Sequence, residues 1–481
     1  MCLMQPRTIL DNPVPTQNVI AELQELSGND VSAKETAIVS GLYDPGAEIN
    51  DLAKSAYGMF LSQNALYFNL YPSVARMEQD LVGAALTLLR GDGSSCGNIT
   101  SGGTESIMLA VKSARDTARQ TRPEVTKPRI VLPITAHPAF HKAAHYLGIE
   151  TVVTKVDPTG FRADLSDFEA ALDDQTILAV GSAPNYSHGT VDPISEMSEL
   201  ARSKGILFHV DGCVGGLYLS YMRRLGLRDK PFDFSLPGVT SISVDLHKYG
   251  YAPKNASLVL YRNRALRQAA WFINSSTTEY AVINPTVQSS RTSGPIAAAW
   301  AVMRHLGHTG YEAMVERCQA TTTKVLKEVG QVRDVDVLAD PEMCIFTLAS
   351  DTLNIFEIDD AMRQLGWMLT PQFACGGGPE NVHVSVHDGV LDRMTRFAPD
   401  LERSAAQLKQ NGSAVDEVKI RQTLASLAGQ PIEQMLGTLM PMAGLTGPNL
   451  PEQLAPMNTI LNHLPAEMRD AALGLYLSAT R

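Results

Sequence analysis

The sequence lacks several features that mark special classes of protein. Its six cysteines include no CxxC pair, and their spacing fits no zinc-binding pattern. No uncharged apolar run is long enough to span a bilayer. The first residues, MCLMQPRTILDNPVP, contain no apolar signal core. We therefore expect a cytoplasmic protein with reduced thiols and no membrane span.

The chain also has fewer basic than acidic side chains, with 40 lysines and arginines against 51 aspartates and glutamates. The 481 residues carry a formal net charge of -11, with 19% charged and 44% hydrophobic residues. The hydrophobic content excludes a disordered chain, and the acidic balance gives no general attraction to nucleic acid or to an anionic membrane. A small anionic ligand must therefore be bound by local cations or by helix N-termini.

Short apolar runs alternate with amphipathic stretches over much of the chain, which favours an α/β fold with a mostly parallel central sheet. The expected strands are Arg129–Ile134, Thr151–Val156, Thr176–Gly181, Ile206–Val210, Thr240–Val244 and Ser257–Tyr261. The expected helices are Thr104–Arg119, His137–Leu147, Asp164–Leu172 and Pro193–Ser203.

Shifts in this pattern predict four parts of the chain. Residues 1–70 form an N-terminal arm, and 71–305 form the large α/β domain. Residues 306–410 are predicted to form a smaller C-terminal α+β domain. Prolines divide the Met-rich tail, 411–481, into short helical pieces whose methionines we expect to fill apolar contacts.

The first motif with chemical meaning is TSGGTES, which begins at Thr100 and precedes a helical pattern. Gly102 and Gly103 allow the backbone to approach an anion closely. The helix start then offers free N–H groups and the positive end of the helix dipole. The motif therefore predicts a phosphate cradle, although by itself it fits a plain Gly-Gly turn equally well.

Two further motifs place charged residues at the ends of apolar strands. Asp211 ends the run FHVD, and Lys248 follows SVDLH. A buried aspartate requires a cationic partner, and a buried lysine can lose its proton and form an imine. Together with the cradle, these residues meet the needs of pyridoxal 5'-phosphate (PLP), namely a phosphate anchor, a ring-nitrogen partner and a Schiff-base lysine.

Three histidines with helical spacing suggest a metal site, but nothing nearby completes a ligand set. These are His137, His141 and His145. His137 lies at a strand-to-helix junction, where its flat ring would stack on PLP, and the other two are expected to be ordinary helix residues. We therefore expect no metal.

In this order, the motifs resemble those of the sphingosine-1-phosphate lyase family, in the PLP-dependent group II decarboxylase-like branch of fold type I. The matching segments are CGNITSGGTESIMLAVKSARD, HPAFHKAAHYLGIE, VGSAPNYSHGTVDP, HVDGCVGGLYL and GVTSISVDLHKYGYAPKNASLVLYR. The resemblance implies an aminotransferase-like fold with a mostly parallel sheet, an N-terminal arm and a smaller C-terminal domain. It also implies PLP as the cofactor.

Roles at the cofactor follow from the resemblance, residue by residue. It implies Gly102, Gly103, Thr104 and His247 at the phosphate, His137 against the ring, Asp211 at the ring nitrogen, and Lys248 as the Schiff-base lysine. Ser290 would reach the phosphate of the cofactor in a partner subunit. That arrangement implies an obligate homodimer with shared active sites.

The substrate residues implied by the resemblance are Tyr43, Asn64, Tyr67, Tyr186 and Lys254. One of them departs from the family. The family sequence after the asparagine is Pro-Leu-His, whereas this chain has Ala65-Leu66-Tyr67. The family histidine helps to bind the substrate phosphate, and Tyr67 donates a hydrogen bond without a positive charge.

The leading hypothesis is retro-aldol cleavage of a phosphorylated long-chain 2-amino-3-hydroxy compound to a fatty aldehyde and phosphoethanolamine. The base stays open among Tyr186, Lys248 and the substrate phosphate. An L-amino-acid decarboxylase on the same scaffold is the alternative, which the loss of the histidine favours and Lys254 opposes. A non-catalytic binding protein would be expected to have lost an essential element, and all of them are present.

Overall fold

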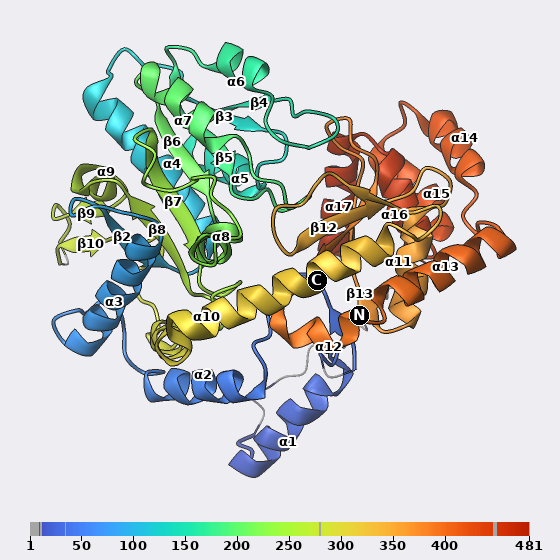
Figure 1. The fold of residues 1–481 in the computed structure, drawn as a ribbon, viewed down its shortest axis with the longest axis horizontal. Coiled ribbons are helices and arrows are strands. Elements are labelled where there is room, and N and C mark those ends of the chain that lie inside the picture. Colours follow the sequence, from blue (N-terminus) through green and yellow to red (C-terminus); the bar gives the residue numbers. More distant parts are fainter. Residues whose placement is uncertain (1–8, 10–11, 34, 279, 446–449, 481) are drawn as a thin grey trace.

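A computed structural model describes residues 9, 12–33, 35–278, 280–445 and 450–480. Its centre is a seven-stranded sheet with the order β2-β8-β7-β6-β5-β3-β4 (Figure 1). Its strands are β2 (Cys96–Thr100), β3 (Arg129–Pro133), β4 (Glu150–Thr154), β5 (Thr176–Ser182), β6 (Leu207–Asp211), β7 (Val239–Asp245) and β8 (Ser257–Tyr261). Strands β4, β3, β5, β6 and β7 pair in parallel, and β8 is antiparallel to both of its neighbours. The expected α/β fold with a mostly parallel sheet is confirmed.

Helices cover both faces of this sheet (Figure 1). They include α4 (Gly103–Thr121), α5 (Ala139–Leu147), α6 (Leu165–Ala171), α7 (Ile194–Ser203) and α8 (Gly215–Arg224). Alternate residues of a strand serve opposite faces. Leu132 and Val180 pack with α4 and α5, whereas Val131 and Phe208 belong to the core cluster that includes α6 and α7. Two-sided burial explains why the strands are nearly continuous apolar runs.

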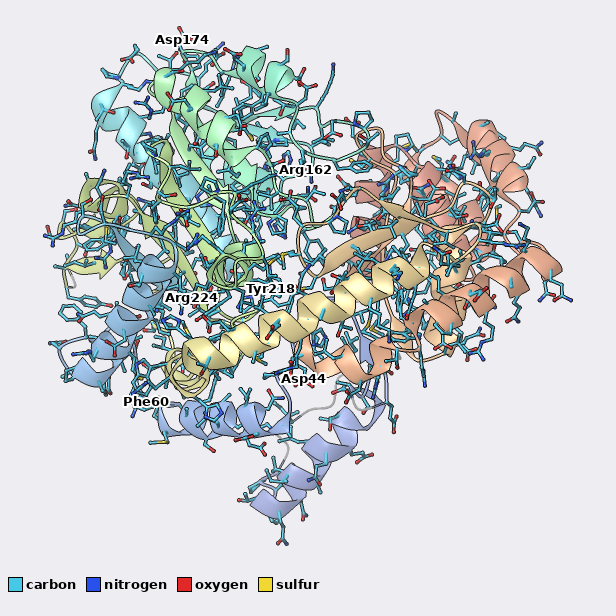
Figure 2. All side chains as sticks on the ribbon, viewed as in Figure 1. Asp44, Phe60, Arg162, Asp174, Tyr218 and Arg224 are labelled. Carbon is cyan, nitrogen blue, oxygen red and sulfur yellow. The ribbon has the colours of Figure 1, made fainter. Side chains whose placement is uncertain are left out.

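A second, antiparallel sheet lies in the C-terminal half of the chain. Its order is β11-β12-β15-β14, formed by Asp336–Leu338, Ile345–Ala349, Asn381–Ser385 and Thr370–Gln372. Helices α11 (Ile355–Gln364), α12 (Leu391–Met394) and α13 (Phe397–Asn411) accompany it. Arg162 extends from the large sheet region toward this part and pairs with Glu342 at 3.0 Å (Figure 2).

Helix α10 (Gly294–Val329) runs along the lower side of both sheets (Figure 1). It is bent at Gly307, where φ is +55°, a backbone conformation that glycine adopts without a steric cost. Tyr218 on α8 donates a hydrogen bond to the Val315 carbonyl and so ties α10 to the large domain (Figure 2).

The N-terminal segment holds α1 (Thr16–Leu26) and α2 (Ala47–Met59), followed by α3 (Pro72–Leu88). Helix α2 packs along α10, and the short strand β1 (Ala37–Ile38) pairs with β13 (Trp367–Met368). A hairpin of β9 (Phe272–Asn274) and β10 (Val282–Asn284) extends beside the central sheet, and α9 (Arg264–Ala269) precedes it.

The tail forms four helices, α14 (Glu417–Leu427), α15 (Ile432–Met442), α16 (Ala455–His463) and α17 (Ala466–Thr480). Pro431 and Pro465 directly precede helices and Pro456 lies in the first turn of α16, where a missing N–H is harmless, whereas Pro441 lies inside α15. Met435 is fully buried, as expected of a methionine that fills apolar contacts. The four-part domain division stays a prediction. Among the described helices, none is both long and apolar enough to cross a membrane.

Candidate active site

The candidate residues gather where the strands of the central sheet end. Gly102 follows β2, His137 follows β3, Tyr186 follows β5, Asp211 ends β6 and Lys248 follows β7. These strands run in the same direction, so their carboxyl ends meet at one edge of the sheet, where open α/β proteins bind their ligands. The sequence predicted this grouping.

The Gly-Gly turn forms the start of the 19-residue helix α4. A Cβ atom on Gly103 would lie 2.8 Å from the Cys213 sulfur and 2.9 Å from an Asp245 oxygen, so only glycine fits there. Next to the turn, the buried Nδ1 of His247 has no hydrogen-bond partner among the described residues. Free N–H groups, the helix dipole and this unpaired nitrogen together suit an anion.

Lys248 forms an ion pair with Asp245, with 3.0 Å between Nζ and Oδ2. Burial lowers the pKa of Lys248, but the charge on Asp245 and the weaker effects of other nearby groups together outweigh burial, so the net pKa is raised. Burial alone would raise the pKa of Asp245, but the charges on Lys248 and His247 bring it below its usual range. The amine is therefore a cation in the free protein.

Asp211 is 7% exposed, and its Oδ1 accepts two hydrogen bonds. One comes from the Cys213 backbone N–H at 3.0 Å and the other from the Ser243 hydroxyl at 3.2 Å. Among the described residues, no hydrogen bond reaches Oδ2. The carboxylate is thus fixed through one oxygen, and the second is free to meet a cationic ring nitrogen.

His137 begins the segment that leads into α5, and its Nδ1 accepts the Ala139 backbone N–H at 3.1 Å. Burial lowers its pKa, against the opposing effect of the Asp211 charge. The ring is therefore neutral, as suits a stacking partner. Within the described part of the chain, no group of three histidine, cysteine, aspartate or glutamate side chains is arranged to bind a metal.

Tyr43 and Lys254 lie together beside the lysine. The Lys254 amine is 5.6 Å from the Tyr43 ring centre and donates to the Gly41 carbonyl at 3.0 Å. The Tyr43 hydroxyl is buried with no partner among the described residues. Burial raises the pKa of Tyr43 above its ordinary value, so the hydroxyl keeps its proton. Both side chains line a cavity of about 470 Å³ that His247 also borders.

Tyr186 contacts both the N-terminal segment and the C-terminal sheet. Its ring stacks on His383 of β15 with 4.2 Å between the ring centres, and its hydroxyl is 3.3 Å from the Ser40 hydroxyl. Because β15 belongs to the C-terminal sheet, this tyrosine is positioned jointly by both halves of the chain.

Asn64, Tyr67 and Ser290 form a separate cluster in the single chain. The Asn64 amide donates to the Ser290 hydroxyl at 3.1 Å, and Asn64 accepts the Arg291 backbone N–H. Tyr67 is 43% exposed. No described hydrogen bond or ion pair joins this cluster to Lys248 or Asp211. The roles assigned to these residues stay predictions.

Two buried acids at this edge were not assigned a role from the sequence. One is Asp245, the partner of Lys248. The other is Glu105, which accepts the Ser101 N–H at 2.6 Å and the Val287 N–H at 2.7 Å, and so joins the cradle to the segment leading to Ser290. Both lie inside the quoted motifs, and Glu105 stands three residues after the Gly102 cap, where a capping glutamate is common.

The donor set fits PLP. The cradle and the unpaired His247 nitrogen suit a phosphate, and the free oxygen of Asp211 suits a protonated pyridine nitrogen. Lys248 supplies the amine for a carbonyl group, and the neutral His137 supplies a flat face. These four features lie at one edge of one sheet, which a chance set of polar residues would not achieve.

Comparison with known proteins supports this view. Residues 3–348 match the pyridoxal-dependent decarboxylase conserved domain, and 419–479 match the C-terminal putative HTH domain of pyridoxal-dependent enzymes. The chain is 34% identical to sphingosine-1-phosphate lyase from Dictyostelium discoideum, over 88% of this chain and 79% of that one. It is 30% identical to an L-aspartate/L-glutamate decarboxylase from Pyrococcus horikoshii, over 74% of this chain and 90% of that one.

Among solved structures, the sphingosine-1-phosphate lyase of Burkholderia pseudomallei superposes with a TM-score of 0.79 at 33% sequence identity. The match covers 89% of this chain and 98% of that one.

Proposed function

Because the chain belongs to the pyridoxal-dependent decarboxylase family, we propose that it is a PLP-dependent carbon–carbon lyase acting on a phosphorylated long-chain base such as sphingosine 1-phosphate. The reaction breaks the C2–C3 bond of the 2-amino-3-hydroxy compound. C3 leaves as a fatty aldehyde, and C2 gains a proton to give phosphoethanolamine. The observation that carries the proposal is the cradle, Asp211 and Lys248 at one sheet edge in a chain this similar to known lyases of this substrate.

PLP, when bound, supplies a ring that accepts the electron pair released from the C2–C3 bond. The residues of the chain hold that ring and control its protons. Asp211 offers an anion to the ring nitrogen and so favours the protonated, electron-withdrawing form. The cradle at Gly102 and Gly103 fixes the opposite end, with His247 beside it.

Proton movement falls to the groups around Lys248. A base must take the proton of the 3-hydroxyl, and an acid must deliver one to C2. Tyr43 keeps its proton because burial raises its pKa, so it suits hydrogen-bond donation rather than the role of base. Lys248 and Tyr186 remain the chain's own candidates for the base, beside the substrate phosphate.

Lys254 supports the choice of a phosphorylated substrate. Its amine borders the cavity of about 470 Å³ beside Tyr43, where an anionic group would meet a cation and a phenol. Partial burial and the charge on Lys248 lower the pKa of Lys254, so a phosphate that arrives there also relieves repulsion between the two amines. Tyr67, which stands where the lyase family has a histidine, favours the alternative, an amino-acid decarboxylase.

Replacement of the lysine tests the cofactor chemistry. Lys248→Ala should lose both the visible absorbance of bound PLP and turnover, because it removes the amine that would form the Schiff base at this sheet edge. A Lys248→Ala variant that keeps both the absorbance of bound PLP and the activity would contradict the proposal.

We also propose an obligate homodimer with shared sites. Among the described residues of one chain, no hydrogen bond or ion pair joins Asn64, Tyr67 or Ser290 to Lys248, and we infer that a second subunit brings them to its site. Exposed apolar side chains surround this cluster, as expected of a surface that a partner covers. They are Phe68, Leu70, Ile283 and Val287, exposed by 68%, 63%, 51% and 58%.

A cytoplasmic location completes the proposal. The five cysteines in the described part of the chain are all unpaired, and three of them are fully buried thiols. Such thiols are usual where the compartment is reducing.

A further inference from the structure

A line of polar side chains lies beneath Asp211 and has no part in the mechanism so far. Strands β6 and β7 pair in parallel, with His209 opposite Ser241 and Asp211 opposite Ser243. Residues two apart on a strand share a face, so these four side chains stand on one face of the sheet. Nδ1 of His209 is 2.8 Å from the Ser241 hydroxyl, and Nε2 is 3.2 Å from the Ser243 hydroxyl.

The positions of the protons follow from the carboxylate. The Asp211 carboxylate can only accept hydrogen bonds, so the hydroxyl of Ser243 donates its one hydrogen bond to Asp211. The Ser243 oxygen can then only accept from His209, which places the proton of the ring on Nε2. Nδ1 is left to accept from Ser241. The hydrogen bonds therefore run in one direction, from Ser241 to His209, from His209 to Ser243 and from Ser243 to the Asp211 carboxylate.

His209 is completely buried. Burial lowers its pKa to about 4, so the ring is neutral at neutral pH and keeps one donor and one acceptor. Phe140 of α5 packs edge-on against it with 5.7 Å between the ring centres, and Asp211 is the charged group near it in the described structure. A buried ring held at both nitrogens cannot turn without leaving a polar atom unsatisfied.

We propose that His209 and Ser243 are positioning residues that orient the Asp211 carboxylate toward the ring nitrogen of PLP. The inference rests on the proposed function and concerns the same site. A hydroxyl that donates to a carboxylate stabilises the charged form. The histidine fixes that hydroxyl, so the effect on the cofactor passes through two hydrogen bonds and needs no contact between His209 and PLP.

Four variants separate this role from ordinary packing. Ser243→Ala removes the donor to Asp211. His209→Phe keeps a ring of similar size and removes both nitrogens, whereas His209→Gln returns an amide N–H near the place of Nε2. Ser220→Ala is the matched control, since Ser220 is fully buried and its hydroxyl bonds only the Gly216 carbonyl in α8.

The readouts are the dissociation constant for PLP itself and the pH dependence of the bound cofactor's absorption spectrum. Ser243→Ala and His209→Phe should raise the dissociation constant by about tenfold, the typical effect of one lost hydrogen bond to a charged group. The spectral change that marks loss of the ring-nitrogen proton should move to lower pH in both. His209→Gln should stay close to the wild type, and Ser220→Ala should match it.

Two results would overturn the proposal. One is a Ser243→Ala protein with wild-type PLP affinity and an unmoved spectral midpoint. The other is equal weakening by Ser243→Ala and Ser220→Ala, which would mean general loosening of the core. If His209→Phe does not fold, the comparison of Ser243→Ala with Ser220→Ala still tests the proposal. Failure of the wild type to bind PLP would instead contradict the proposed function, so the two failures are distinguishable.

Discussion

At the scale of single residues, the buried carboxylates of Asp211 and Asp245 have different roles at the sheet edge. Asp211 is held through one oxygen and leaves the other free, whereas Asp245 is committed to the Lys248 amine at 3.0 Å. A buried ion pair of this kind gives little net stability, but it fixes where the charges are. Asp245 therefore sets the protonation of the lysine before the cofactor arrives.

Removal of the Asp245 charge should make the lysine easier to deprotonate. In Asp245→Asn the raised pKa of Lys248 should fall, because the opposite charge is gone and burial remains. Only the neutral amine reacts with an aldehyde, so the pH midpoint for the rate of PLP uptake should move downward. Stopped-flow absorbance over a pH series measures it.

Asp116→Asn is the matched control, since Asp116 pairs with Lys112 at 2.9 Å on α4 and its variant should leave the midpoint unchanged. An uptake midpoint in Asp245→Asn that stays at the wild-type pH contradicts the role given to Asp245.

Residue type and position predicted Asp211, Lys248 and His137, because each follows a strand whose end faces the ligand edge. The same reasoning did not find Asp245, since a strand-end aspartate three residues before a lysine has no distinctive pattern until their side chains are seen to meet. Nor could residue patterns show that Asn64 and Ser290 meet, because their hydrogen bond joins residues 226 positions apart in the chain.

At the scale of elements, the start of α4 is the most constrained feature. The helix begins where β2 ends, and its first residue, Gly103, touches the strand ends that carry Asp245 and Cys213. The closeness of this contact lets the free N–H groups of the helix reach the space above Lys248. A side chain here would push the helix start away from the sheet.

Gly103→Ala should therefore abolish tight PLP binding. Its new Cβ would lie 2.8 Å from the Cys213 sulfur, which real Cβ atoms essentially never do. Gly474→Ala in α17 is the control, because its Cβ would meet nothing within 4 Å. We expect at least about a hundredfold loss of PLP affinity for the first and none for the second, measured by fluorescence titration. Equal affinities would contradict a phosphate cradle at this turn.

Six of the seven strands of the central sheet were predicted nearly to their ends, because burial on both faces makes them short apolar runs between polar turns. Strand β2 was missed, because its sequence CGNIT is not an apolar run. The short strands β9 and β10 were missed, since their residues are mostly exposed and carry no such pattern. In the tail, the prolines predicted short helical pieces, and the structure has four helices there. Pro431 and Pro456 stand at helix starts, whereas Pro441 lies inside α15.

At the scale of the whole molecule, the question is whether one chain holds a complete site. Mixing inactive variants answers it. Lys248→Ala lacks the lysine, and Ser290→Asp places a carboxylate where a phosphate from the partner would lie. If sites are shared, a mixed dimer has one site with both changes and one with neither. Unfolding and refolding equal amounts together should restore about a quarter of wild-type activity.

The control for this experiment mixes Lys248→Ala with Asp211→Ala. Both residues belong to the same sheet edge of one chain, so every site in a mixed dimer carries one change. No activity should return. Equal results from the two mixtures, or a protein that runs as an active monomer on size-exclusion chromatography, contradict the shared site.

The central claim is that this chain cleaves the C2–C3 bond of a phosphorylated long-chain base. The most direct measurement offers purified, PLP-loaded protein sphingosine 1-phosphate, unphosphorylated sphingosine and a mixture of L-amino acids in parallel, and follows aldehyde, amine and carbon dioxide. We predict aldehyde and phosphoethanolamine in equal amounts from the phosphorylated substrate alone, with Tyr67 serving in place of the family histidine. Carbon dioxide from an amino acid without any aldehyde would contradict the account and make the protein a decarboxylase.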